Sequence, residues 1–221
     1  MVDIFDEVDE DLRAERAQQL LKRYGGVIIA GALLVVGAAA GWQAWRWYEA
    51  RQDQAAAAEY LTAMNLVESP AGVSDAAKNS AAIAMFGKLE TGAPEGYRTL
   101  ARLRGAAAMA ASGDLARALT LWDQVAADTS ADPLLRDLAS LMWAAHQIDT
   151  GDPAMLQARL APLAAADNPW HALAEEQVAL LNMRLGKSDE AKTTLRRLAQ
   201  DATAPNGVRG RAETLLSRLG G

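Results

Sequence analysis

Hydrophobic and polar positions follow two different patterns along this chain. Residues 25–45 contain no charged side chain, whereas charged and apolar residues are mixed at short intervals before and after them. A helix rises about 1.5 Å per residue, so this stretch would measure roughly 30 Å, the thickness of a bilayer's hydrocarbon core. Aromatic residues with a polar edge, which suit the headgroup layer, gather at its end: Trp42, Trp45, Trp47 and Tyr48. The pattern predicts a single transmembrane helix over residues 24–47.

This apolar stretch has two other interpretations. In a secretion signal, Val27 to Gly37 would be the apolar region and Ala38 to Ala40 the cleavage site. Signal peptides begin with a short basic segment, whereas residues 1–23 here are rich in Asp and Glu, and the apolar character continues past the supposed cleavage site. A buried core helix is the third interpretation. We favour the retained membrane anchor.

The distribution of basic residues around the span predicts its orientation. Four precede it and two follow it closely: Arg13, Arg16, Lys22 and Arg23, then Arg46 and Arg51. Because Lys and Arg accumulate on the cytoplasmic side, residues 1–23 are predicted to be a cytoplasmic tail. Residues 48–221 would then lie outside, in the periplasm of a bacterium with two membranes. Phe5, Val8 and Leu12 share one helical face of the tail, which indicates either a docking segment or a short solvated helix.

Small residues mark one face of the predicted span. Gly37 and Gly41 form a G-x-x-x-G pair, and Ala30 and Ala44 lie close to the same face at helical spacing. Small residues let a second helix approach closely in lipid, so these four are candidate helix-packing residues. The alternative is that Gly and Ala are simply common in membrane helices.

The rest of the chain is predicted to be all-α. No proline or glycine interrupts Trp47 to Glu68, so the membrane helix is expected to continue as a stalk. Further helices are expected at 75–90, 94–112, 114–128, 133–149, 153–166, 170–185, 188–201 and 206–218. No strand is expected, because β-branched residues nowhere alternate with polar ones over a useful length.

Turn residues recur with a period near 35. Pro133, Pro169 and Pro205 are each 36 residues apart, at positions where a new helix should begin. Gly113-Asp114, Gly151-Asp152 and Gly186-Lys187 lie between them, where a helix should turn back. This spacing is typical of stacked helical hairpins. We expect four of them, with 49–90 as a divergent first hairpin.

The second helices of these hairpins resemble the tetratricopeptide repeat, which has a small residue before a large one. Ala118 and Trp122 match this pair, as do Ala191 and Leu195, whereas the middle hairpin has Leu156 and Leu160. The large aromatic residue expected early in each first helix is missing, and Arg102, Ser140 and Glu175 occupy its place. The resemblance implies degenerate repeats.

Stacked hairpins leave a long concave wall, which favours binding over catalysis. The candidate binding-groove residues are apolar: Leu100, Leu103, Leu138, Leu141, Ile148, Leu173, Leu180 and Met183. Repeats that hold acidic C-termini need Lys and Asn on this wall, and those are absent. The alternative is that these side chains belong to the core.

Composition and motifs give no support for catalysis. The chain is 51% hydrophobic and 23% charged, has a net charge of −6 and contains no cysteine, so a disulfide framework, a thiolate nucleophile and a basic nucleic-acid surface are not expected. His146 and His171 form no H-E-x-x-H pair. Gly186-Lys187-Ser188 resembles the end of a P-loop, but Leu181 stands where that motif begins with glycine. We expect no enzyme, no metal site, no cofactor, no nucleic-acid partner and no small-molecule substrate.

The whole arrangement resembles the ancillary SecYEG translocon subunit family, the YfgM-like proteins, and GWQAWRWYEARQDQAAAAEYLTAM carries most of the resemblance. It implies a single-pass inner-membrane protein with a periplasmic repeat domain that associates with the SecYEG translocon and passes exported polypeptides to periplasmic chaperones. An alternative of another class is a tetratricopeptide-repeat scaffold for cell-envelope assembly or cell division, because a related repeat domain occurs in a cell-division coordinator.

Overall fold

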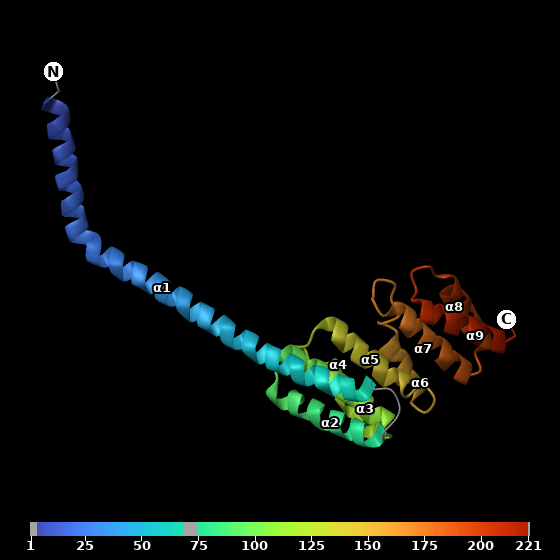
Figure 1. The fold of residues 1–221 in the computed structure, drawn as a ribbon. Coiled ribbons are helices and arrows are strands. Elements are labelled where there is room, and N and C mark those ends of the chain that lie inside the picture. The colour runs from blue at the N-terminus through green and yellow to red at the C-terminus, as the bar shows by residue number, and fades with distance from the viewer. Residues whose placement is uncertain (1–3, 69–74, 221) are drawn as a thin grey trace. The chain divides into compact units, whose positions relative to one another are not determined.

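The fold is seen in a computed structural model that describes residues 4–68 and 75–220 (Figure 1). All regular structure in these two ranges is helical, as the sequence predicts. The helices are α1 (Ile4–Glu68), α2 (Asp75–Gly92), α3 (Glu95–Ala111), α4 (Leu115–Ala127), α5 (Pro133–Ala145), α6 (Pro153–Leu160), α7 (His171–Arg184), α8 (Ser188–Gln200) and α9 (Asn206–Arg218).

Helix α1 carries the apolar stretch. Among the described residues, one helical segment is long and apolar enough to cross a membrane, and it lies within Lys22–Glu68 of α1. None of its most apolar window is buried in the protein. Leu34 is 75% exposed and Trp42 69% exposed, so the interpretation of this stretch as a buried core helix has no support. The helix continues without interruption through Trp47 to Glu68, as predicted for the stalk. Phe5, Val8 and Leu12 lie where side chains are not described.

The chain divides into two compact units, residues 1–52 and residues 53–221. From α2 onward, each helix packs on the next along the chain, and α7 also packs on α5 and on α9. The end of α1 belongs to the second unit, because Ala56 and Ala63 are buried against Phe86 and Leu89 of α2. The described helices therefore form four successive hairpins, α1–α2, α3–α4, α5–α6 and α7–α8, and α9 follows as a final helix.

Glycine makes the turns inside the hairpins in two different ways. Gly113 and Gly186 have φ of 91° and 74°, in the left-handed region that other residues rarely adopt. Gly151 is required for space instead, because a Cβ there would lie 2.9 Å from the Gln147 carbonyl oxygen and 3.3 Å from a Leu156 methyl group.

Aspartate and proline start helices at the positions that the sequence indicates. Pro133 and Pro153 occupy the first turns of α5 and α6, where the missing N–H has no helical partner to lose. The Asp132 carboxylate accepts a hydrogen bond from the Leu134 N–H at 2.8 Å, and the Asp152 carboxylate accepts one from the Met155 N–H at 2.9 Å. Such caps satisfy N–H groups that the helix itself leaves unpaired.

Two helices end four or more residues before their predicted ends, whereas the ends of the others differ from the prediction by at most two residues. Helix α6 ends at Leu160 rather than at residue 166, because Pro162 cannot donate a backbone hydrogen bond and its ring clashes with the preceding turn. Helix α5 ends at Ala145 rather than at residue 149. The chain tightens there, with the Gln147 N–H bonded to the Ala144 carbonyl three residues back.

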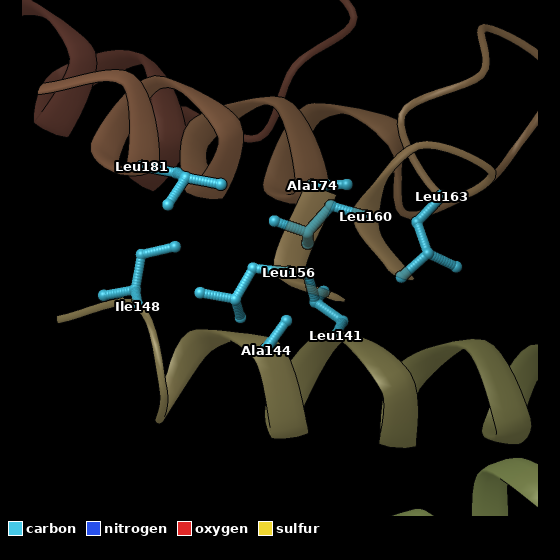
Figure 2. Packing of buried hydrophobic residues seen from close by; sticks show 8 residues of the cluster. All are labelled: Leu141, Ala144, Ile148, Leu156, Leu160, Leu163, Ala174 and Leu181. Atoms are coloured by element: carbon cyan, nitrogen blue, oxygen red, sulfur yellow. The ribbon is translucent and has the colours of Figure 1, made fainter. Parts of the chain in front are cut away.

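The matched small and large residues of the second helices lie at the centre of the hairpins. Trp122, Leu160 and Leu195 are completely buried, and so are their partners Ala118, Leu156 and Ala191. Figure 2 shows the core of the middle hairpin, where Leu156 and Leu160 of α6 lie between Leu141 and Ala144 of α5 and Ala174 of α7. The middle unit therefore keeps the packing although it departs from the motif, because two leucines fill the space that a small and a large residue fill elsewhere.

Polar bonds between equivalent positions hold consecutive hairpins together. The Trp170 indole Nε1–H donates to the Leu134 carbonyl at 3.0 Å, and the Arg184 guanidinium donates to the Ile148 carbonyl at 2.7 Å. Each of these pairs is separated by 36 residues, one repeat length. The 36-residue spacing of the prolines in the sequence is thus also the spacing of these bonds between hairpins.

Candidate protein-binding groove

A groove of about 310 Å³ opens between the end of α1 and helices α3, α4 and α5. Its lining is largely apolar and comes from four helices: Tyr60 of α1, Leu100, Leu103, Arg104 and Ala107 of α3, Trp122 of α4, and Leu135, Leu138 and Met142 of α5.

Helical spacing explains why these residues gather. On α3, Leu103 and Arg104 lie three and four residues after Leu100, and Ala107 lies four and three residues after them; on α5, Leu135, Leu138 and Met142 follow one another at intervals of three and four. Residues three and four apart lie on one face of a helix, so α3 and α5 each present one apolar face to the groove. Trp122, which is fully buried on α4, contributes the wall between these two faces.

Tyr60 brings the end of α1 into the groove. Its ring packs edge-on against Phe86 of α2, with centroids 5.8 Å apart, and lies 6.3 Å from the ring of Tyr97 on α3. Sequence reasoning missed Tyr60 because this part of α1 was treated as a stalk. The available signal was a lone aromatic residue in a run of alanines, since Ala56 and Ala63 lie beside it at helical spacing.

The structure distributes the predicted groove residues over three surroundings. Leu100, Leu103 and Leu138 line the groove together, although Leu103 is only 6% exposed and also belongs to the core around Trp122. Leu141 and Ile148 are 4% and 9% exposed and point into the middle core, as Figure 2 shows.

The remaining predicted groove residues belong to the C-terminal hairpin, and all three are half-buried. Leu173 packs against both the middle and the last core cluster, Leu180 against the middle one, and Met183 against the last one. Among the predicted residues, Leu100 and Leu138 therefore supply the partly exposed apolar surface of the groove.

Trp122 forms part of the groove wall and has one unusual feature. Its side chain is fully buried, yet its indole N–H has no hydrogen-bond partner among the described residues. The His146 ring packs on it, with centroids 4.5 Å apart, while His146 Nδ1 lies 2.9 Å from the Met142 carbonyl oxygen. Most buried donors in proteins are paired, so this wall has an unused donor.

Charge is sparse in the groove. Arg104 is the charged member of the described lining, and it is exposed and has no ion pair or hydrogen bond there. Arg102, two residues earlier, instead lies 3.4 Å from carboxylates of Glu90 and Asp128. The pKa of Asp128 is lowered, chiefly by the hydrogen bonds it accepts from Ser130 and also by the charge of Arg102. Arg102 thus holds neighbouring segments together where a tetratricopeptide repeat has an aromatic residue.

The other chemistry-bearing residues are scattered. No group of three metal-ligating side chains occurs in the described part of the chain. The two histidines belong to different hairpins: His146 packs on Trp122, and His171 lies 4.0 Å from Asp201. A shallow second pocket is bounded by Asp123, Trp143 and Arg159, where the arginine pairs with the aspartate and stacks 4.1 Å above the indole centroid.

The residues predicted to act in the membrane are exposed on α1. No described atom would lie within 4 Å of a Cβ added at Gly37 or Gly41. In the aromatic cluster, the Trp45 Nε1–H donates to Glu49 at 2.7 Å, and the Arg51 guanidinium lies 5.3 Å from the centroid of the Trp47 ring. The Trp45 N–H group and the Arg51 charge thus lie close to the C-terminal end of the apolar stretch.

Comparison with known proteins identifies the class of this chain. The sequence model of the tetratricopeptide repeat-like domain family matches residues 18–212, most of the chain's length. The chain therefore belongs to the tetratricopeptide repeat-like domain family, whose members typically act as non-catalytic interaction scaffolds. No curated protein and no solved structure matches the chain.

Proposed function

We propose that this protein is a membrane-anchored scaffold whose groove between α1, α3 and α5 binds a segment of another protein. The observation that carries the proposal is the groove itself, where Leu100, Leu138 and Met142 present apolar surface that the helices of the repeat domain leave uncovered. Concave apolar grooves on rigid helical stacks bind peptide segments by covering such side chains. The family's typical role as an interaction scaffold supports the same conclusion.

The apolar part of α1 is the proposed anchor. It spans the inner membrane once, with Gly37, Gly41, Ala30 and Ala44 packing against a partner helix and Trp42, Trp45, Trp47 and Tyr48 at the outer interface. The exposure of this segment supports the anchor, because a helix whose apolar side chains stay uncovered in water would aggregate. The excess of basic residues before the span supports a cytoplasmic N-terminus and a periplasmic repeat domain.

The proposed partners follow from the resemblance to ancillary translocon subunits. The span associates with the SecYEG translocon, and the groove holds exported polypeptides or the periplasmic chaperones that receive them. Cell-envelope assembly or division is the alternative setting for the same scaffold.

Photo-crosslinking in intact cells tests the groove. A photoreactive amino acid at Leu138 is expected to form specific crosslinks to protein, because this half-buried side chain lines the groove. Leu134, one turn earlier on α5 and exposed outside the groove, is the matched control. Equal crosslinking at both positions would contradict a groove-specific partner. Identification of the crosslinked proteins distinguishes translocon subunits and chaperones from division proteins.

A second experiment tests the membrane part. Replacing Gly37 and Gly41 with leucine is expected to reduce crosslinking of the span to translocon subunits, because the larger side chains separate the helix backbones. Unchanged crosslinking removes the glycine pair from the proposal. Reporter fusions at the C-terminus test sidedness, and activity of a cytoplasmic reporter there would contradict the periplasmic assignment.

A further inference from the structure

The polar groups of the groove are donors, and this observation deepens the proposed function, on which the inference rests. Two lining side chains with exposed surface can donate hydrogen bonds, the Arg104 guanidinium and the Tyr60 hydroxyl, whereas the Trp122 indole N–H is buried. The described lining includes no Asp, Glu, Asn or Gln side chain that could accept from them. A partner segment that carries an acceptor would complement these exposed donors.

The positive charge of Arg104 favours a negatively charged acceptor on the partner segment. Arg104 is exposed within an otherwise uncharged lining, and no described residue pairs with it, whereas Arg102 on the same helix has two carboxylates. A guanidinium in apolar surroundings is matched best by a carboxylate, which can accept two of its hydrogen bonds at once. The repeat domain leaves this positive charge unmatched although the chain carries a net charge of −6.

We infer that the groove accepts a partner segment in which one Asp or Glu lies between apolar side chains, and that Arg104 binds this carboxylate. Apolar residues flank Arg104 on both sides along α3, Leu100 and Leu103 before it and Ala107 after it. A segment that covers both flanks must continue in both directions from the carboxylate. An acidic side chain inside a segment meets this requirement, whereas a free C-terminal carboxylate has chain on one side alone.

Binding of designed peptides to the full-length protein in detergent micelles tests the inference. The probe is a fluorescein-labelled amphipathic peptide about 15 residues long, with leucines on both sides of a central Glu; two others carry Gln or Lys at that position. Fluorescence anisotropy is expected to give a Kd for the Glu peptide about three- to tenfold lower than for the Gln peptide. This preference should shrink as salt is added, because the charge pair is partly exposed.

Variants of the protein locate the effect. Arg104→Gln is expected to abolish the preference for Glu over Gln, and Arg104→Glu to reverse it in favour of the Lys peptide. Arg196→Gln is the matched control, since Arg196 is exposed on α8 outside the groove lining and should leave the preference unchanged.

The outcomes separate this inference from the function on which it rests. Equal binding of the three peptides, weakened by Leu138→Ala, would overturn the role of Arg104 and leave the apolar groove standing. Failure of every peptide to bind would overturn the groove and the inference together. Tighter binding of a peptide that ends in a free carboxylate at the same position would overturn the assignment to an internal acidic residue.

Discussion

Two glycine residues in the repeat domain differ in backbone conformation, and therefore in their effect on stability. Gly113, between α3 and α4, has a φ of 91°, which a residue with a side chain adopts at a cost of about 1–2 kcal/mol. Gly87 lies inside α2, where the helix needs no glycine and a Cβ would meet no described atom within 4 Å. The same chemical change should therefore have opposite effects at these two positions.

We expect Gly113→Ala to lower the free energy of unfolding by about 1–2 kcal/mol and Gly87→Ala to raise it by about 0.5–1 kcal/mol. Each kcal/mol should shift Tm by about 2–4 °C in a domain of this size. Thermal unfolding followed by circular dichroism measures both changes. Neither site has a described atom close to the new methyl group, so the comparison isolates the backbone. Shifts of the same sign would contradict this explanation of the hairpin turn.

At the scale of helices, α9 covers one face of the α7–α8 hairpin. It packs on α8 and α7 through Val208 and Ala212, which are 1% and 0% exposed, while most of its other side chains are polar and exposed. Without α9, the α7–α8 hairpin would expose the apolar face that Val208 and Ala212 cover. The Arg211 guanidinium also donates two hydrogen bonds of 2.6 Å to Glu176 of α7, and these bonds raise the pKa of Arg211.

Loss of this pair should loosen α9 specifically. Arg211→Met leaves the Glu176 carboxylate, which is 3% exposed, without its partner, and we expect a loss of stability of about 1–3 kcal/mol. Hydrogen exchange of the α9 amides should accelerate. Arg218→Met on the same helix is the control, and its effect should stay within about 0.5 kcal/mol. Combining Arg211→Met with Glu176→Met should restore part of the loss, because no unpaired buried charge then remains. A double variant with a lower free energy of unfolding than Arg211→Met would contradict this explanation of the Arg211–Glu176 pair.

The sequence predicts the helices well because their ends are decided locally. Pro133, Gly113 and Gly186 impose backbone geometry on their own neighbours, so their positions indicate where helices begin and turn. The groove depends on side chains far apart in sequence. Leu103 and Leu141 have the same apolar character in the sequence, but only Leu103 lines the groove, and the contribution of Tyr60 appears only once α1 packs on α2 and α3. Periodicity identifies an apolar face without identifying what covers it.

At the scale of the whole molecule, α1 has an exposed apolar part and a part that packs in the repeat domain. The apolar part of α1 exposes Leu33 to Val36 and the tryptophans, whereas beyond residue 53 the same helix has Ala56 and Ala63 buried in the first hairpin. The buried clusters of the repeat domain take their members from residues after 53 alone. The repeat domain thus contains its own core, and the apolar stretch contributes nothing to it.

This division predicts that residues 53–221 fold without the anchor. Expressed alone, they should stay in solution and unfold with a Tm within a few degrees of that of the repeat domain in the full-length protein, since their core clusters are complete. Removing residues 53–64 as well should lower Tm markedly, because Phe86 and Leu89 of α2 then lose Ala56, Tyr60 and Ala63. The full chain should remain in the membrane fraction after carbonate extraction, whereas residues 53–221 should not. If the shorter chain fails to unfold cooperatively while the full chain does, the apolar stretch stabilises the repeat domain directly, and α1 is more than a tether.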